Sequence, residues 1–347
     1  MSASHWRQWL RWLAPVAALA AVLVILRDQL PFFGEAWQAI GAASPLPLAC
    51  AAATAALALA AMAAVMQILL NVDGPVADAA GTNAITLASN AWSTTVPGGP
   101  AISAWLTYRV HRSWGASPGL CGWFFVVSGA LSTVWMVLIG VVAVMLLGAE
   151  LSLWSLLATL AAAALTIAAV FWATVHPAVL KRWVRFLPDK VRGRVDGVID
   201  QVAAIRISGP AFTAAAGLSL ANQLLDVATM VFSVWAVTGV MPGGAPGGPE
   251  VASSSDGISL MGVCLAYVMT KLAGSAQVTP GGLGTVEPVA AGMLVAGGLT
   301  LAHATAATVV YRAISFVLIT AIGWVVYAAV YAGRGFMVGR PVAGDAV

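Results

Sequence analysis

The stretch VTPGGLGTVEP, Val278–Pro288, stands between two runs of apolar residues. Proline removes a backbone hydrogen-bond donor and glycine readily leaves helical geometry, so a helix that reaches Pro280 should end there. A break at membrane depth is tolerated only where protein buries it or where it lines a watery cavity. The stretch therefore predicts a broken helix in a membrane bundle, followed by a short helix that begins near Glu287.

The composition of the whole chain indicates the same class of fold. Of the 347 residues, 61% are hydrophobic and 8% are charged, and the mean hydropathy is +0.92. A soluble domain has too little polar surface left at this composition, so we predict an all-α, polytopic membrane helix bundle. The net charge of +3 is spread over short loops, which argues against nucleic acid as a partner. Cys50, Cys121 and Cys264 lie in apolar runs without metal-ligand spacing, so we expect no metal site and no cofactor.

Seven apolar runs are long enough to cross a bilayer, which takes about 20 residues per helix. They lie near residues 12–27, 46–70, 119–147, 151–175, 210–240, 258–278 and 302–332. A mixed aromatic and polar segment at 31–43 is too short to cross and predicts an interfacial helix.

The lysines and arginines of the short loops predict the orientation, because positively charged loops stay cytoplasmic. Both the N-terminus (1–11) and the C-terminal tail (336–347) are expected in the cytoplasm of a bacterium, with one plasma-membrane domain at 12–335. A basic cytoplasmic segment at 176–209 joins two halves, at about 12–175 and 210–335. That segment is either a solvated connector, which we favour, or an amphipathic helix on anionic lipid.

The break has a counterpart in the first half, TTVPGGP, Thr94–Pro100. The corresponding residues are Pro97, Gly98 and Gly99 in the first half and Pro280, Gly281 and Gly282 in the second. Paired interruptions of this kind indicate inverted repeats and point to a transporter's binding site. A plain turn at the membrane surface would also explain one such motif.

Polar residues precede the first break at helical spacing. Asn83, Thr86, Asn90 and Ser93 step by three or four, so a helix gathers them on one face. That face must look into protein or water, and the segments 80–100 and 258–300 are therefore either re-entrant or fully spanning. The two asparagines either contact a substrate or join helices by hydrogen bonds.

Four ionisable residues fall within predicted membrane segments: Asp226, Lys271, Glu287 and Arg312. Each is costly in hydrocarbon, so each must face the bundle interior and find a partner. Asn222 and Ser275 lie four residues from Asp226 and Lys271 and are polar neighbours on the same helix faces. The four charges either pair among themselves or contact and gate a charged headgroup. Their proximity to the break favours the second role for Glu287 and Arg312.

The sequence contains no phosphate-binding GxxxxGK[ST] loop, no zinc-binding histidine motif and no nucleophile elbow. We therefore expect no catalytic residue and no enzyme activity, and we expect no ATP-driven pumping by this chain itself. The oligomeric state is left open, and a homo-oligomer is one of the alternatives.

Three stretches together resemble a known family. NAWSTTVPGGPAISAWLTYRVHRSWGAS (Asn90–Ser117), TPGGLGTVEPVAAGMLVAGG (Thr279–Gly298) and VVYRAISFVLITAIGWVVY (Val309–Tyr327) are similar to the transmembrane domain of lysylphosphatidylglycerol synthases, also called flippase-like or UPF0104 proteins. The resemblance extends from about residue 12 to 335. It implies a bundle with two re-entrant elements that moves an aminoacylated or otherwise charged phospholipid between leaflets.

By motif, the resemblance assigns Glu287 and Arg312 to the second signature and Arg109 to the first, and Asp226 to a membrane acid of the family. Two departures stand out. The chain ends at Val347 without the soluble aminoacyltransferase domain of the synthases, and it reads PGGPA where many members have Gly-Glu after the proline. We expect a lipid flippase-like transporter; the alternative is a non-transporting partner or scaffold for a separate lipid-modifying transferase.

Overall fold

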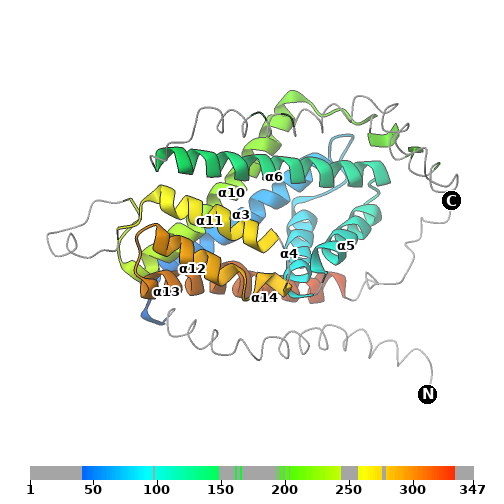
Figure 1. The fold of residues 1–347 in the computed structure, drawn as a ribbon. Coiled ribbons are helices and arrows are strands. Elements are labelled where there is room, and N and C mark those ends of the chain that lie inside the picture. Colours follow the sequence, from blue (N-terminus) through cyan, green and yellow to red (C-terminus); the bar gives the residue numbers. More distant parts are fainter. Residues whose placement is uncertain are drawn as a thin grey trace, which may run out of the picture. The chain divides into compact units, whose positions relative to one another are not determined.

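The computed structural model describes residues 41–96, 98–147, 204–243, 257–275 and 279–332, with a few further positions between 161 and 202. Within these residues the ordered elements are all helices (Figure 1). The predicted all-α class is thus confirmed. The predicted span at 12–27 and the tail at 336–347 lie outside the described residues, as do nearly all of the predicted span at 151–175 and of the interfacial segment at 31–43.

Among the described residues, four helices are long and apolar enough to cross a membrane. They are α3 (Pro45–Leu70), α6 (Pro118–Leu146), α10 (Gly209–Thr238) and the continuous helix Leu301–Tyr331. Each lies within two residues of a predicted span. The remaining predicted span, 258–278, contains α11 (Leu260–Ser275), which is apolar but has only 16 residues. The described residues therefore account for four of the seven predicted spans.

Two of the long helices begin at a polar side chain that caps them. The Ser117 side chain accepts a hydrogen bond from the backbone N–H of Leu120 at 3.1 Å, and Pro118 takes the first helical position of α6, where its missing donor does no harm. Thr300 has the same role at the start of α13 (Leu301–Arg312), where it accepts from the backbone N–H of His303 at 3.4 Å. Because each cap accepts a hydrogen bond from a backbone N–H that has no partner within the helix, it marks where that helix begins.

The first Pro-Gly-Gly motif separates two short helices, as the sequence predicts. Helix α4 (Ala79–Thr95) ends before it and α5 (Gly99–Ser113) begins at its last glycine. Gly98 has a φ of 69°, a left-handed conformation that favours glycine. Pro97 itself lies outside the described residues.

The second motif also separates two helices. Helix α11 ends at Ser275, a 3₁₀ turn η3 covers Pro280–Gly282, and α12 (Val286–Ala296) follows. Gly281 and Gly282 have φ values of 62° and 67°. The expected short helix after the break is therefore present, with Glu287 in its first turn.

The chain forms two compact units that interleave along the sequence: 1–57, 84–107 and 225–347 in the first unit, and 58–83 and 108–224 in the second. The predicted halves, and their inverted repeat, stay predictions. In the first unit, α12 packs against both α11 and α13 (Figure 1).

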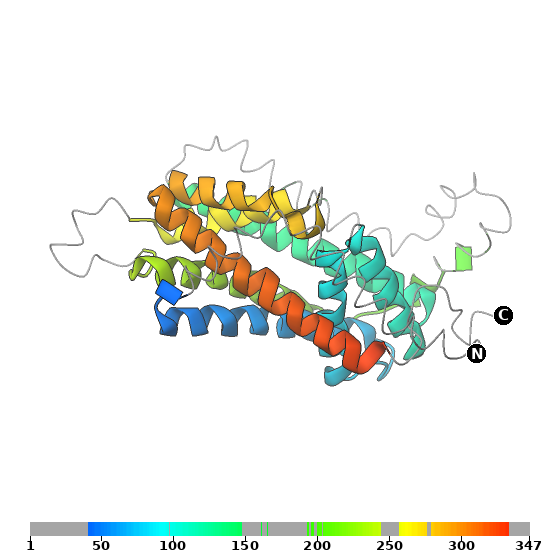
Figure 2. The same ribbon diagram turned by 90° about the horizontal axis from the view of Figure 1, so that it is seen from below.

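The helix Leu301–Tyr331 of the first unit is continuous but not uniform (Figure 2). α13 passes into the π-helical turn η4 (Ala313–Leu318), then α14 (Ile319–Val326), then a second π-helical turn η5 (Tyr327–Tyr331). Such wide turns are uncommon and are found at functional sites more often than elsewhere. The first of them begins directly after Arg312.

The second unit has its own polar and aromatic contacts. Trp135 of α6 donates through Nε1 to the Ala216 carbonyl at 2.9 Å, and the Gln223 amide donates to Ser132 Oγ at 2.7 Å, so α6 is tied to α10 at two points. His111 is fully buried beside Phe124, at 5.1 Å between ring centroids. Its Nε2 lies 3.3 Å from the sulfur of Met66.

Candidate functional site

Arg312 binds both the second break and the helix α12 that follows it. Its Nε donates to Glu287 Oε1 at 2.8 Å, and its Nη2 donates to the Gly281 carbonyl at 2.7 Å. The other carboxylate oxygen of Glu287 accepts from the Gly284 backbone N–H at 2.7 Å. The Arg312 and Glu287 side chains are only 9% and 17% exposed. This ion pair is therefore enclosed and its polar atoms are satisfied largely by the protein.

The backbone of the break is satisfied in the same way. Thr279 Oγ1 donates to the Leu283 carbonyl at 2.7 Å, and Thr285 Oγ1 donates to the Gly282 carbonyl at 2.9 Å. These threonines flank the glycines and replace the hydrogen bonds that a helix would have made. A break at membrane depth requires such replacement, because no water is present there to satisfy its backbone.

Phe316 completes the surroundings of Arg312. The guanidinium carbon lies 4.5 Å from the centre of the Phe316 ring, within the range of a cation–π interaction. The edge of the same ring stands where a Cβ atom on Gly281 would be, and the Thr94 carbonyl would be 3.0 Å from that atom. Gly281 is therefore required by a close approach from two sides as well as by its φ.

The two broken stretches meet at this point within the first unit. Thr94, at the end of α4, shares a hydrogen bond of 3.0 Å between its Oγ1 and that of Thr320 on α14. One turn further along, Gly323 lies directly against the Leu87 carbonyl, and a Cβ at Gly323 would be 2.9 Å from that of Ala91. Sequence reasoning noticed that the motifs correspond, but it missed Phe316, Thr320 and Gly323. The spacing of 316, 320 and 323 along one face was a signal for them.

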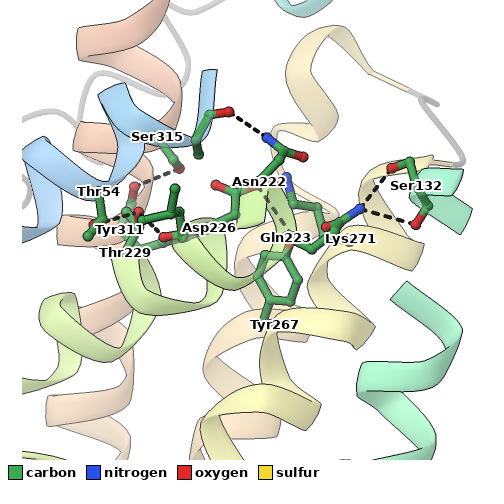
Figure 3. A network of polar contacts seen from close by, with 12 residues as sticks. Thr54, Ser132, Asn222, Gln223, Asp226, Thr229, Tyr267, Lys271, Tyr311 and Ser315 are labelled. Carbon is green, nitrogen blue, oxygen red and sulfur yellow. Dashed lines mark hydrogen bonds and ion pairs between the residues drawn. The ribbon is translucent and has the colours of Figure 1, made fainter. Parts of the chain in front are cut away.

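The second ion pair lies between α10 and α11 (Figure 3). Lys271 Nζ is 2.6 Å from Asp226 Oδ2, and the Tyr267 hydroxyl donates to the same oxygen at 3.3 Å. Lys271 Nζ also stands 5.5 Å from the centre of the Tyr267 ring. The Lys271 side chain is 41% exposed and that of Asp226 is 18% exposed. This pair is therefore more open than the pair of Glu287 and Arg312.

The polar neighbours expected for these charges bond elsewhere. Asn222 donates through Nδ2 to the Ala58 carbonyl at 2.8 Å, within the second unit. Ser275 donates to the Leu272 carbonyl of its own helix at 2.6 Å. The Ser275 hydroxyl has a backbone carbonyl of its own helix within reach, and that acceptor takes the bond. The Asn222 amide instead bonds a carbonyl of another helix, α3.

The predicted site residues divide between the two units. Asn90 belongs to the first unit, half-buried on α4, and its carbonyl accepts from Thr94 Oγ1 at 2.8 Å. Asn83 and Arg109 belong to the second unit, where Asn83 Nδ2 donates to the Ala79 carbonyl at 2.8 Å. The first unit thus contains Asn90 and all four membrane charges, and the roles of Asn83, Asn90 and Arg109 in binding stay predictions.

Among the described residues, no group of three or more His, Cys, Asp or Glu side chains is placed to hold a metal ion. The three cysteines are free thiols, with Cys121 buried and Cys50 and Cys264 half-buried. The chemistry of the described site therefore consists of ion pairs, hydroxyls, backbone carbonyls and aromatic rings.

Long apolar helices, interrupted helices and paired charges together define a multi-pass membrane protein. Residues 251–323 match the family model described as the lysylphosphatidylglycerol synthase TM region, and this match confirms the resemblance to that family over these residues. The matched residues include Lys271, the second break, Glu287 and Arg312. Among curated proteins no match was found.

Proposed function

We propose that the protein is a flippase-like transporter that moves a lipid with a charged headgroup between the leaflets of a bacterial plasma membrane. The observation that carries this proposal is the open ion pair of Asp226 and Lys271 on two helices of a membrane bundle. A charge at membrane depth is costly, and charges in transporters mark the paths of polar cargo. A lipid headgroup is such cargo, while its acyl chains can stay in the bilayer.

The two Pro-Gly-Gly breaks support the same proposal. In transporters, interrupted helices form substrate sites because their ends offer backbone groups and hinges. Here both breaks belong to the compact unit that also contains the open ion pair. The proposal includes cytoplasmic termini and no enzyme activity.

A second function has its own supporting observation. The pair of Glu287 and Arg312 is enclosed and bound to the backbone of the break, as expected of a purely structural contact. If both pairs were structural, the protein would be a membrane partner or scaffold for a separate transferase. Transport by the purified chain distinguishes these functions.

The test uses the full chain in vesicles that contain trace phospholipids labelled with a fluorophore on an acyl chain, so that the headgroup is unchanged. An impermeant reductant bleaches the outer leaflet, and further bleaching reports lipid that has crossed. We expect faster crossing with the protein than in empty vesicles, and loss of that gain in the double variant Asp226→Asn/Lys271→Gln. Ser275→Ala, which removes a hydroxyl bonded to its own helix, is the matched control and should transport normally.

Two results would contradict the proposal. One is a crossing rate equal to that of empty vesicles for labelled phosphatidylethanolamine, phosphatidylglycerol and lysylphosphatidylglycerol alike. The other is an unchanged rate in the double variant at equal protein content. Either result would favour the scaffold function.

A further inference from the structure

The two ion pairs of the first unit differ in how far their cationic side chains are exposed to a ligand. Arg312 has two protein acceptors and an aromatic ring against it, and its side chain is 9% exposed. Lys271 has the Asp226 carboxylate as its ion-pair partner, and its side chain is 41% exposed. A ligand can therefore approach Lys271 without first displacing the backbone of the break.

The charge balance at this pair limits which ligands are suitable. Asp226 and Lys271 together carry no net charge, and removing one partner of such a pair leaves the other charge uncompensated at considerable cost. An anionic headgroup that paired with Lys271 would leave the Asp226 carboxylate without a compensating positive charge. A headgroup that carries one phosphate and one ammonium would replace one ion pair by two.

Tyr267 makes the acidic side of the pair suitable for an ammonium group. Its hydroxyl holds Asp226 Oδ2 at 3.3 Å, and its ring already faces the ammonium of Lys271 at 5.5 Å. Because Tyr267 is fully buried, an incoming ammonium would meet the ring only by taking the present position of the Lys271 ammonium. In that position it would have an ionic contact with the carboxylate and a cation–π contact with the ring, as Lys271 does now. The phosphate would then take the place of the carboxylate beside Lys271.

We propose that Asp226 and Lys271 form a binding site for a net-neutral, zwitterionic phospholipid headgroup, with its phosphate on Lys271 and its ammonium on Asp226. This inference rests on the proposed function, because it names the class of lipid that the transporter takes. It excludes as preferred ligands both an anionic headgroup and a headgroup with two ammonium groups on one phosphate.

The test measures binding of three short-chain lipids to the purified full chain in a non-ionic detergent. Dihexanoyl phosphatidylethanolamine is the zwitterion, dihexanoyl phosphatidylglycerol the anion, and dihexanoyl lysylphosphatidylglycerol the lipid with two ammonium groups. We expect the zwitterion to bind about tenfold more tightly than either of the others, a difference of about 1.4 kcal/mol.

Variants at the pair separate ligand contact from a structural role. Asp226→Asn leaves Lys271 unpaired and should reverse the order in favour of phosphatidylglycerol. The charge-exchanged variant Asp226→Lys/Lys271→Asp keeps both charges and should keep the preference for the zwitterion. This variant provides the test if Asp226→Asn does not fold. Asp78→Asn, the same acid-to-amide change at a carboxylate that accepts from the Gly81 backbone, should leave the order unchanged.

The inference is overturned if the wild-type protein prefers phosphatidylglycerol or has no preference, or if folded Asp226→Asn keeps the wild-type order. It fails separately from the proposed function. Lipid crossing in vesicles with no change of headgroup order in Asp226→Asn would refute the site and keep the transporter. The expected order of binding without any lipid crossing would keep the site and refute transport.

Discussion

The ring of Phe316 occupies the space in which a side chain on Gly281 would stand. Phe316 belongs to a π-helical turn and Gly281 to the second Pro-Gly-Gly break, so this contact places the break against the helix Leu301–Tyr331. The guanidinium of Arg312 lies over the same ring and binds the Gly281 carbonyl. Phe316, Gly281 and Arg312 therefore form one cluster in which each residue contacts the other two.

Replacing Gly281 by alanine should lower stability strongly. The left-handed conformation alone costs about 1–2 kcal/mol for a residue with a Cβ, and the overlap with Phe316 adds about 1–3 kcal/mol. Thermal unfolding in detergent measures the loss. Gly284→Ala is the control, because Gly284 has a φ of 80° but no atom within 4 Å of its would-be Cβ, so it should lose only the first amount. Equal losses for the two variants would show that Phe316 is not in the way.

Gly323→Ala should separate α4 from α14. Its Cβ would overlap the Leu87 carbonyl, which is backbone and cannot turn aside, so we expect a loss of about 1–3 kcal/mol. Gly292→Ala is a matched helical control, because nothing lies within 4 Å of its would-be Cβ. That variant should be neutral or more stable by up to about 1 kcal/mol, since alanine favours a helix. A destabilised Gly292→Ala beside an unaffected Gly323→Ala would contradict the contact.

Arg312→Gln should destabilise the protein by about 3–5 kcal/mol, because it leaves the enclosed Glu287 without its cation. Arg312→Lys keeps the charge but not the planar fork, so it should lose less. The double variant Arg312→Gln/Glu287→Gln should be more stable than Arg312→Gln alone, because neither charge is then unpaired. Unfolding of all three by heat in one detergent tests this order, and a double variant that is the least stable of the three would refute it.

Acid should weaken the second unit through His111, which lies at the end of α5, outside the four candidate spans. Burial lowers the pKa of His111 from 6.5 to about 4. The neutral form is therefore the folded form, and the stability present above pH 6.5 is lost as the pH falls towards about 4. The expected loss at pH 5 is about 2 kcal/mol.

His111→Phe removes the titrating group while keeping a ring among the aromatic neighbours. Its unfolding temperature should therefore change less than that of the wild type between neutral pH and pH 5. A wild-type protein whose stability does not fall over this interval would contradict the prediction.

The sequence was most informative where one physical rule dominates. Apolar length predicted α3, α6 and α10 within two residues, and proline and glycine predicted both breaks. The rule that buried charges need partners predicted that Asp226 and Lys271 would find some. That rule could not predict which residue pairs with which, because four charges can pair in more than one way. The choice depends on how the helices pack.

What the sequence could not predict depends on contacts between segments far apart in the chain. Nothing local to Thr94 indicates a hydroxyl of Thr320 opposite it, and nothing local to Gly281 indicates the ring of Phe316. Nor does spacing along α10 reveal that the Asn222 amide binds the carbonyl of Ala58 and not a neighbour on its own helix.

The wide turns η4 and η5 have a consequence for the alignment of these contacts. In a regular helix of 3.6 residues per turn, side chains four apart drift steadily around the axis. A π-helical turn takes up more residues and reverses that drift. Arg312, Phe316 and Thr320 are four residues apart, and η4 lies between the first and the last of them. Arg312 and Phe316 contact Gly281 of the second break, and Thr320 contacts Thr94 beside the first. Deleting a single residue from η4 would rotate the side chains of α14 away from α4. The direction in which these side chains point around the helix axis therefore matters as much as which residues they are.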